Sequence, residues 1–207
     1  SEGEIQYENF NACKAEFEIR GFNVHPGEGK DTMINASLVA IEINNCLPSM
    51  ETPRGTEDYE GFYHLISMQG EVGEAKLNYI VRDHDKNGFE ERKKTLRLIE
   101  KNLNAKWGEG TVTLKITDQY LNMKEIVEEH MHLIDHAKKA CEAVGVAPLI
   151  LPIRGGTDGC QLSFKGLPCP NLGTGGHAFH GPYEHISVEG MEKSVELLLA
   201  LIQEYTK

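Results

Sequence analysis

Hydrophobic and polar positions along the chain predict an ordered series of strands and helices. Four segments alternate between apolar and polar side chains as half-buried strands do, and two repeat apolar side chains with helical spacing. In chain order we predict a strand over 5–19, a helix over 32–47, strands over 62–70 and 74–85, a helix over 89–107 and a strand over 111–120. The order β-α-β-β-α-β is the ferredoxin-like one, with both helices on one face of a four-stranded sheet. The other face or an edge strand then stays free, and such edges are commonly used for dimerisation.

The pattern changes after residue 118. A helix is predicted over 129–144, a short buried strand in "APLILPI" and an amphipathic helix over 188–206, with glycine-rich segments between them. Helices that alternate with short buried strands are typical of an α/β sheet. Roughly 90 residues are few for an independent α/β domain. We therefore expect a ferredoxin-like first domain over 5–118, followed over 119–207 by a portion of an α/β domain.

Composition and charge narrow the range of partners. The chain has 207 residues, of which 40% are hydrophobic and 26% charged, an ordinary globular balance. The net charge of −11 argues against binding to nucleic acid or to an anionic membrane surface. The five cysteines are odd in number and form no C-x-x-C pair, which predicts free thiols in a reducing cytoplasm. The first residues hold neither an initiator Met nor a signal peptide, which suggests an internal start.

The stretch "NLGTGGHAFHGPYEH", residues 171–185, combines glycines with three histidines and a glutamate. His180 is the strongest candidate metal ligand, because a loop after a strand can bring a side chain to the end of a sheet. Glu184 could orient that imidazole or cap the next element. The alternative for His180 is simple exposure to solvent, and that alternative is stronger for His177 and His185. A catalytic zinc needs about three protein ligands, so this stretch does not make a site by itself.

Two other segments carry candidate binding residues. In "RGGTDG", Arg154 can bind a carboxylate through two hydrogen bonds, while the glycines let the backbone approach a ligand. The alternative is a turn in which Asp158 is the N-cap of a helix that begins near Cys160. In "NVHPG", His25 lies between a strand and a helix, and by itself this segment indicates only a turn.

Two further groups of side chains are weaker candidates for metal sites. Asp83 and Asp85 in "RDHD" could hold a metal, but an exposed loop or a helix N-terminus is the preferred interpretation. His132 and His136 share a helix face. Position 133 is Leu, so the segment is not the H-E-x-x-H zinc motif, which needs a glutamate between its histidines.

Seven motifs occur in order along the chain: "YENFNA", "NVHPG", "YEGFYHL", "RDHD", "PIRGGTDG", "LSFKGLPCPNL" and "HAFHGPYE". Together they resemble the peptidase T family of tripeptide aminopeptidases. That family belongs to the co-catalytic di-zinc metallopeptidases, which also include carboxypeptidase G-type and aminoacylase-type enzymes. The resemblance covers essentially the whole chain, and "GLPCPN" preceded by "RGGTDG" is its most distinctive part. It implies a cytoplasmic zinc peptidase that removes the N-terminal residue of tripeptides by means of a metal-activated water.

The resemblance also implies how the chain is organised. Residues 5–118 would be the lid, or dimerisation domain, through which the protein forms a homodimer. Residues 119–207 would be the C-terminal part of the zinc-exopeptidase catalytic domain. The family's general base and most of its zinc ligands precede the lid, and they match nothing in this chain. The resemblance therefore implies a truncated chain, inactive alone, in which at most one ligand of the two-zinc site is present.

By the same resemblance, four residues receive roles. His180 would be the metal ligand. His25 would reach from the lid, either within its own subunit or across the dimer, to stabilise the tetrahedral oxyanion. Arg82 and Arg154 would bind the peptide backbone or its C-terminal carboxylate. Two alternatives stay open: a stand-alone dimerisation or binding module, and a dipeptidase or deacylase of the same superfamily.

Overall fold

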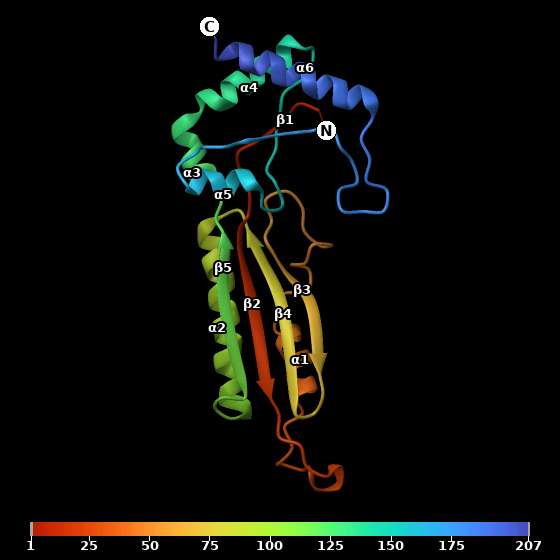
Figure 1. Cartoon of the computed structure of the whole chain (residues 1–207). Helices are drawn as coiled ribbons and strands as arrows, with labels where there is room; N and C mark the ends of the chain where they lie inside the picture. The colour runs from red at the N-terminus through yellow and green to blue at the C-terminus, as the bar shows by residue number, and fades with distance from the viewer. Residues whose placement is uncertain (1, 207) are drawn as a thin grey trace. The chain divides into compact units, whose positions relative to one another are not determined.

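The computed structural model describes residues 2–206, and these divide into two compact units. The central unit runs from Phe10 to Tyr120. The flanking unit combines residues 2–9 with residues 121–206. Each unit has its own sheet, and the two are described separately (Figure 1).

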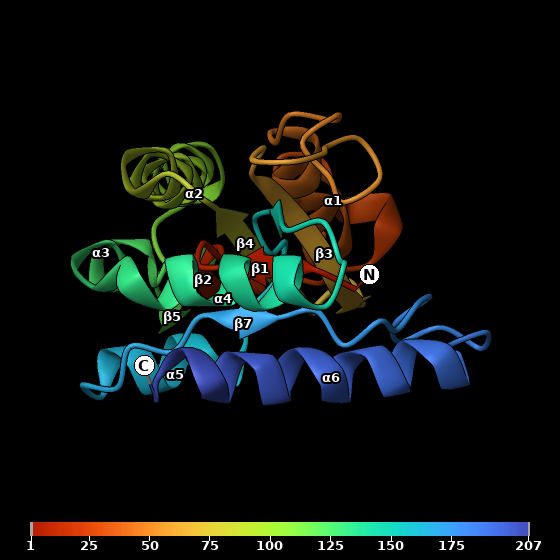
Figure 2. The same cartoon turned by 90° about the horizontal axis from the view of Figure 1, so that it is seen from above.

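The central unit has the predicted ferredoxin-like fold. Its strands are β2 (Asn11–Arg20), β3 (Phe62–Gly70), β4 (Glu74–Asp83) and β5 (Val112–Tyr120), and they form an antiparallel sheet in the order β3-β4-β2-β5. Its helices are α1 (Ala36–Asn45), α2 (Lys86–Trp107) and the short 3₁₀ helix η1 (Pro26–Glu28). Figure 2 shows α1 and α2 on the same side of this sheet. The order of elements and the layering that the sequence predicted are confirmed.

The core of the central unit follows from the pleat of its two middle strands. Successive side chains of a strand point to opposite faces, so the side chains of β2 from Cys13 to Ile19 are buried at every second position. Helix α2 contributes the apolar stripe that its sequence predicted: Phe89, Leu96, Ile99 and Leu103 are all buried. The polar side chains of these strands therefore lie on the sheet face away from the helices.

The single strand predicted over 5–19 is interrupted in the structure. Its first part is β1 (Glu4–Gln6), which belongs to the flanking unit, and β2 starts only at Asn11. Between them the buried Asn9 amide donates to the Leu121 carbonyl at 3.1 Å and accepts from the Met123 N–H at 2.9 Å. These bonds tie together the two places where the chain passes between the units. The alternation hides this break because both halves are themselves half-buried strands.

The flanking unit contains a small mixed sheet. Strand β1 pairs in parallel with β6 (Leu149–Ile150) and antiparallel with β7 (Asn171–Leu172). Its helices are α3 (Lys124–Val127), η2 (Glu128–His130), α4 (His132–Ala143), α5 (Asp158–Phe164) and α6 (Val188–Glu204), and α4 packs against α6. The predicted helices near 129–144 and 188–206 are confirmed. In the structure the central unit spans 10–120, whereas the sequence predicted a first domain over 5–118 and a second over 119–207. The start differs because residues 5–9 belong to the flanking unit.

Apolar side chains are unusually exposed in the flanking unit. Strand β6 was predicted to be buried, yet Leu149 and Ile150 are 45% and 41% exposed. Helix α6 buries only Gly190 and Leu197, although most of its residues are apolar. Strands of two residues and a helix with so little buried surface do not complete a hydrophobic core. Within residues 2–206, no helix combines the length and apolar character needed to cross a membrane.

Candidate functional site

His180 lies in a small closed loop between β7 and α6. At the base of the loop, His177 and His185 exchange two backbone hydrogen bonds, of 2.9 and 3.1 Å. Their imidazole rings stack with centroids 5.4 Å apart. The His180 N–H donates to Glu184 Oε2 at 3.0 Å. Glu184 therefore binds the backbone of His180, and the imidazole is exposed at the tip of the loop.

The described residues do not form a metal centre by themselves. Residues 2–206 contain no group of three or more His, Cys, Asp or Glu side chains placed to hold a metal ion. A zinc site needs about three protein ligands, and His180 offers one. The donors within residues 2–206 therefore do not fit a complete zinc site.

The histidines of the flanking helices pack mainly against aromatic rings. The ring centroids of His132 and His136 on α4 are 6.1 Å apart, and His136 meets the Tyr205 ring edge-on at 4.5 Å. The buried Nδ1 of His136 has no hydrogen-bond partner within the described residues. The structure shows a shared helix face for these two histidines, as the sequence indicated.

Arg154 is half-buried in the segment between β6 and α5. The helix that follows is capped by Thr157, whose hydroxyl accepts from the Cys160 N–H at 3.3 Å and from the Asn171 side chain at 3.1 Å. Asp158 is the first residue of α5, so its interpretation as the N-cap is wrong by one position. The Thr157 hydroxyl therefore links the start of α5 to β7 through the Asn171 side chain.

Arg82 lies on the sheet face opposite the helices, since its neighbours Val81 and Asp83 are buried on the helix side. Its Nη1 donates to Gln119 Oε1 at 3.3 Å, and its guanidinium stands 4.8 Å from the centre of the Tyr120 ring. Burial lowers the pKa of Arg82 from its usual value. An arginine keeps its charge through such a change, so this side chain is a fixed cation at the end of β4.

His25 and Arg82 lie at opposite ends of the central sheet. Arg82 pairs with Ala12 at the start of β2, whereas His25 follows the far end of that strand at Arg20. The strand between those two ends measures roughly 25 Å at the usual rise per residue. Figure 1 shows the η1 loop beyond the end of the sheet. His25 is exposed, and its Nδ1 accepts from the Gly27 N–H at 3.2 Å. One copy of the central unit therefore does not bring these two residues to one small ligand.

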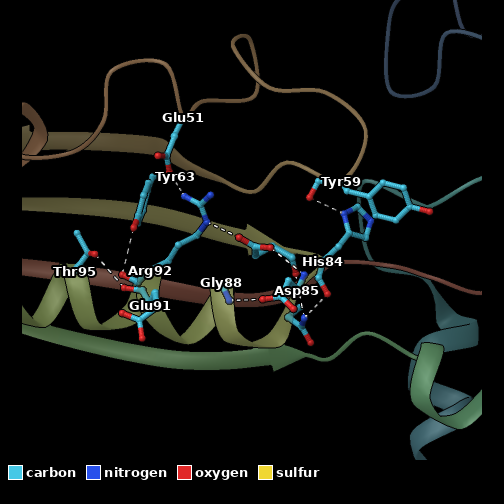
Figure 3. Close-up of polar contacts among 11 residues, drawn as sticks. Glu51, Tyr59, Tyr63, His84, Asp85, Gly88, Glu91, Arg92 and Thr95 are labelled. Atoms are coloured by element: carbon cyan, nitrogen blue, oxygen red, sulfur yellow. Dashed lines mark hydrogen bonds and ion pairs between the residues drawn. The ribbon is translucent and has the colours of Figure 1, made fainter.

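A partly buried ionic network lies at the end of β4, where the sequence analysis considered a metal site (Figure 3). Arg92 on α2 donates through Nε to Asp83 Oδ2 at 2.8 Å, and its Nη1 pairs with Glu51. Burial lowers the pKa of Arg92, but hydrogen bonds to Asp83 and Glu51 more than offset this, so its pKa is raised. Asp85 caps α2 by accepting from the Gly88 N–H at 2.6 Å, which confirms the helix N-terminus.

Sequence reasoning did not find this network, because its members are far apart in the chain. Asp83 and Arg92 are nine residues apart, and Glu51 lies 41 residues before Arg92. Within "RDHD", His84 is also buried, with its ring 4.1 Å from that of Phe10 and 5.1 Å from that of Tyr59. The motif is therefore a packed strand end whose carboxylates already have protein partners.

Comparison with known proteins identifies a matching family model and several similar proteins. A family model described as the peptidase dimerisation domain matches residues 7–111. Proteins named peptidase T are 51% identical in Caldanaerobacter subterraneus subsp. tengcongensis and 54% identical in Clostridium perfringens, in each case over 99% of this chain and 50% of the relative. The chain thus spans about half the length of the curated relatives it matches.

Solved structures agree on the fold. The aminopeptidase PepT of Bacillus cereus has a TM-score of 0.82 at 22% identity, covering 100% of this chain and 56% of its own. A tripeptidase of Staphylococcus aureus has a TM-score of 0.83 at 17% identity, covering 98% of this chain and 53% of its own. At such low identity these likenesses establish the fold alone.

Proposed function

Since this chain belongs to the peptidase dimerisation-domain family, we propose that it is part of a metal-dependent aminopeptidase that removes the N-terminal residue of tripeptides. The observation that carries the proposal is the identity of 51–54% with several proteins named peptidase T, over nearly the whole chain. The relatives are about twice as long, so the activity belongs to a longer protein.

We assign the central unit to the lid and dimerisation domain, and the flanking unit to the C-terminal part of the catalytic domain. The family match over residues 7–111 supports the first assignment. The exposed apolar residues of β6 and α6 support the second, because a larger domain would cover them. In this proposal the homodimer forms through the central unit, which leaves one sheet face and two edge strands uncovered.

Zinc is the proposed cofactor of the longer protein, with His180 as the ligand from this chain. Since residues 2–206 hold no metal centre of their own, the other ligands and the general base would come from outside them. Arg154 and Arg82 are fixed cations, suited to the backbone or terminal carboxylate of a short peptide. Their charge would restrict the enzyme to peptides short enough to present that carboxylate.

His25 is proposed to stabilise the oxyanion of the tetrahedral intermediate in the active site of the partner subunit. Its position supports this role, since it is exposed on a loop at the opposite end of the sheet from Arg82. A histidine there can serve a substrate held near Arg82 only from a second copy of the chain.

The proposed substrates are short peptides, and the proposed location is the cytoplasm. All five cysteines are free, which fits a reducing compartment. The net charge of −11 supports a protein that binds neither nucleic acid nor an anionic membrane surface.

The test is hydrolysis by the longer protein of a tripeptide made of three different residues, followed by mass spectrometry. We expect the free N-terminal residue and the C-terminal dipeptide, with loss of activity in a chelator and recovery on adding zinc. The matched dipeptide and the N-acetylated tripeptide should be poor substrates. Preferred cleavage of the dipeptide or of the acyl group would instead identify a dipeptidase or deacylase.

A further inference from the structure

The loop from His177 to His185 has a defined internal structure. The backbone bridge between these two residues closes it. Inside, the Gly181 N–H donates to the Ala178 carbonyl at 3.1 Å, and the Glu184 N–H donates to the Gly181 carbonyl at 3.2 Å. Two successive turns therefore fill the loop, and Glu184 is the last residue of the second turn.

His180 occupies a position in the first turn that usually belongs to glycine. It is the third of the four residues from Ala178 to Gly181, and its φ is +62°. A turn with positive φ at its third residue favours glycine, because a side chain there is strained. Ala178 is also left-handed, with a φ of +54°. Such strain persists only where surrounding contacts impose it, and it is concentrated at functional sites.

Glu184 supplies a contact that engages the strained residue directly. Its Oε2 accepts from the His180 N–H at 3.0 Å. A hydrogen bond to an ionised carboxylate is stronger than one between neutral groups. The turn from Gly181 to Glu184 brings this carboxylate within hydrogen-bond distance of the His180 N–H, while His180 itself stays exposed to solvent.

We propose that Glu184 is a positioning residue, whose carboxylate holds His180 in the left-handed conformation and so presents the imidazole. The effect of Glu184 on the His180 backbone is independent of the proposed function. The further step, that the imidazole then binds a metal, rests on the proposed function. The side chain of Glu184 acts through the loop and touches neither substrate nor metal in this assignment.

The hold is tested in the longer protein, where the rest of the domain covers the flanking unit, by NMR measurement of backbone amide exchange at His180. In Glu184→Ala the His180 amide should exchange roughly three to ten times faster, the range expected for the loss of one hydrogen bond. Glu184→Gln should restore much of the protection, since its amide oxygen can still accept. Glu192→Ala, the same change on α6, is the control and should leave the rate unchanged. Equal rates in the wild type and Glu184→Ala overturn the proposal.

A second variant separates positioning from general loop stability. Glycine adopts positive φ without strain, so His180→Gly no longer needs the carboxylate. We expect Glu184→Ala to speed exchange at the His177 and His185 amides when His180 is present, and to have little effect when Gly replaces it. An equal effect in both backgrounds would mean that Glu184 merely stabilises the loop, which contradicts the proposal.

Zinc affinity of the longer protein tests the use of the loop. Residues that orient a ligand typically change metal affinity by about 10- to 100-fold when replaced. Glu184→Ala should therefore weaken zinc binding at least tenfold, and Glu184→Gln less. If His180→Ala weakens binding but Glu184→Ala does not, the positioning role is overturned. If neither variant weakens it, the assignment of His180 in the proposed function is the part that fails.

Discussion

At the scale of single residues, burial makes the two thiols of the central unit differ in reactivity. Cys13 points into the core, where burial, and to a smaller extent the charge of Asp118, raises its pKa to about 12. Cys46 follows α1 and is exposed. At pH 8 the folded chain therefore keeps Cys13 protonated, and only the thiolate is nucleophilic. We predict that iodoacetamide at pH 8 alkylates Cys46 at least about tenfold faster than Cys13.

Peptide mapping by mass spectrometry after timed quenching measures both rates in one sample. In urea the two thiols should react at similar rates, because the difference comes from the fold. Rapid alkylation of Cys13 in the native chain would contradict the buried position that the alternation of β2 requires.

At the scale of elements, Arg92 ties α2 to β4 and to the loop before β3. Its side chain is 15% exposed and that of Asp83 is 11% exposed, whereas Glu51 is 40% exposed. Replacing Arg92 with Ala leaves the Asp83 carboxylate buried without its ionic partner. Since breaking a buried pair costs about 3–5 kcal/mol and one acceptor here is half-exposed, we predict a loss of about 2–3 kcal/mol in the free energy of unfolding.

Urea titration followed by the fluorescence of Trp107 measures this loss, because Trp107 is the only tryptophan and ends α2. Lys94→Ala is the matched control on the same helix. Its ion pair with Glu91 has both side chains about two-thirds exposed, so its removal should cost less than about 0.5 kcal/mol. Equal midpoints for Arg92→Ala and the wild type would show that the network adds nothing to stability.

Periodicity predicted the elements of the central unit well, because each strand or helix there buries one face against a single core. It failed where contacts join distant segments. The break at Asn9 depends on hydrogen bonds to residues 121–123, and β7 exists only because it pairs with β1. The role of Glu184 was only half foreseen: spacing placed it near His180, but not its bond to the backbone. Such features need the folded neighbourhood, which a local pattern does not contain.

At the scale of the whole molecule, the first prediction concerns metal binding by this chain alone. The described residues offer no group of three ligands, so a zinc ion would bind through one or two histidines. We predict weak binding, well below one tight zinc per chain, in equilibrium dialysis with metal analysis. His180→Ala should change that result little. Two tight zinc ions per chain would mean that a complete site lies within these residues and that the proposed half-site is wrong.

In the proposed dimer of the longer protein, each active site would combine residues from both subunits. If His25 serves the partner's site, His25→Ala and His180→Ala each inactivate the protein when present in both subunits. In a mixed dimer, however, the subunit that keeps His180 receives an intact His25 from its partner, so one of the two sites is complete.

Random pairing makes half of the dimers mixed, and half of their sites complete, so we predict about a quarter of the wild-type tripeptidase activity on co-expression. Each variant carries a different affinity tag, and tandem purification isolates the mixed dimer, which should show about half of the wild-type activity. Mixing the separately purified proteins under conditions that prevent subunit exchange is the control and should restore none. If His25 instead serves its own subunit, every site in the mixed dimer lacks one histidine, and the activity stays at the level of the single variants. The separation of His25 from Arg82 along β2 favours the first outcome, since a single central sheet holds the two residues at opposite ends.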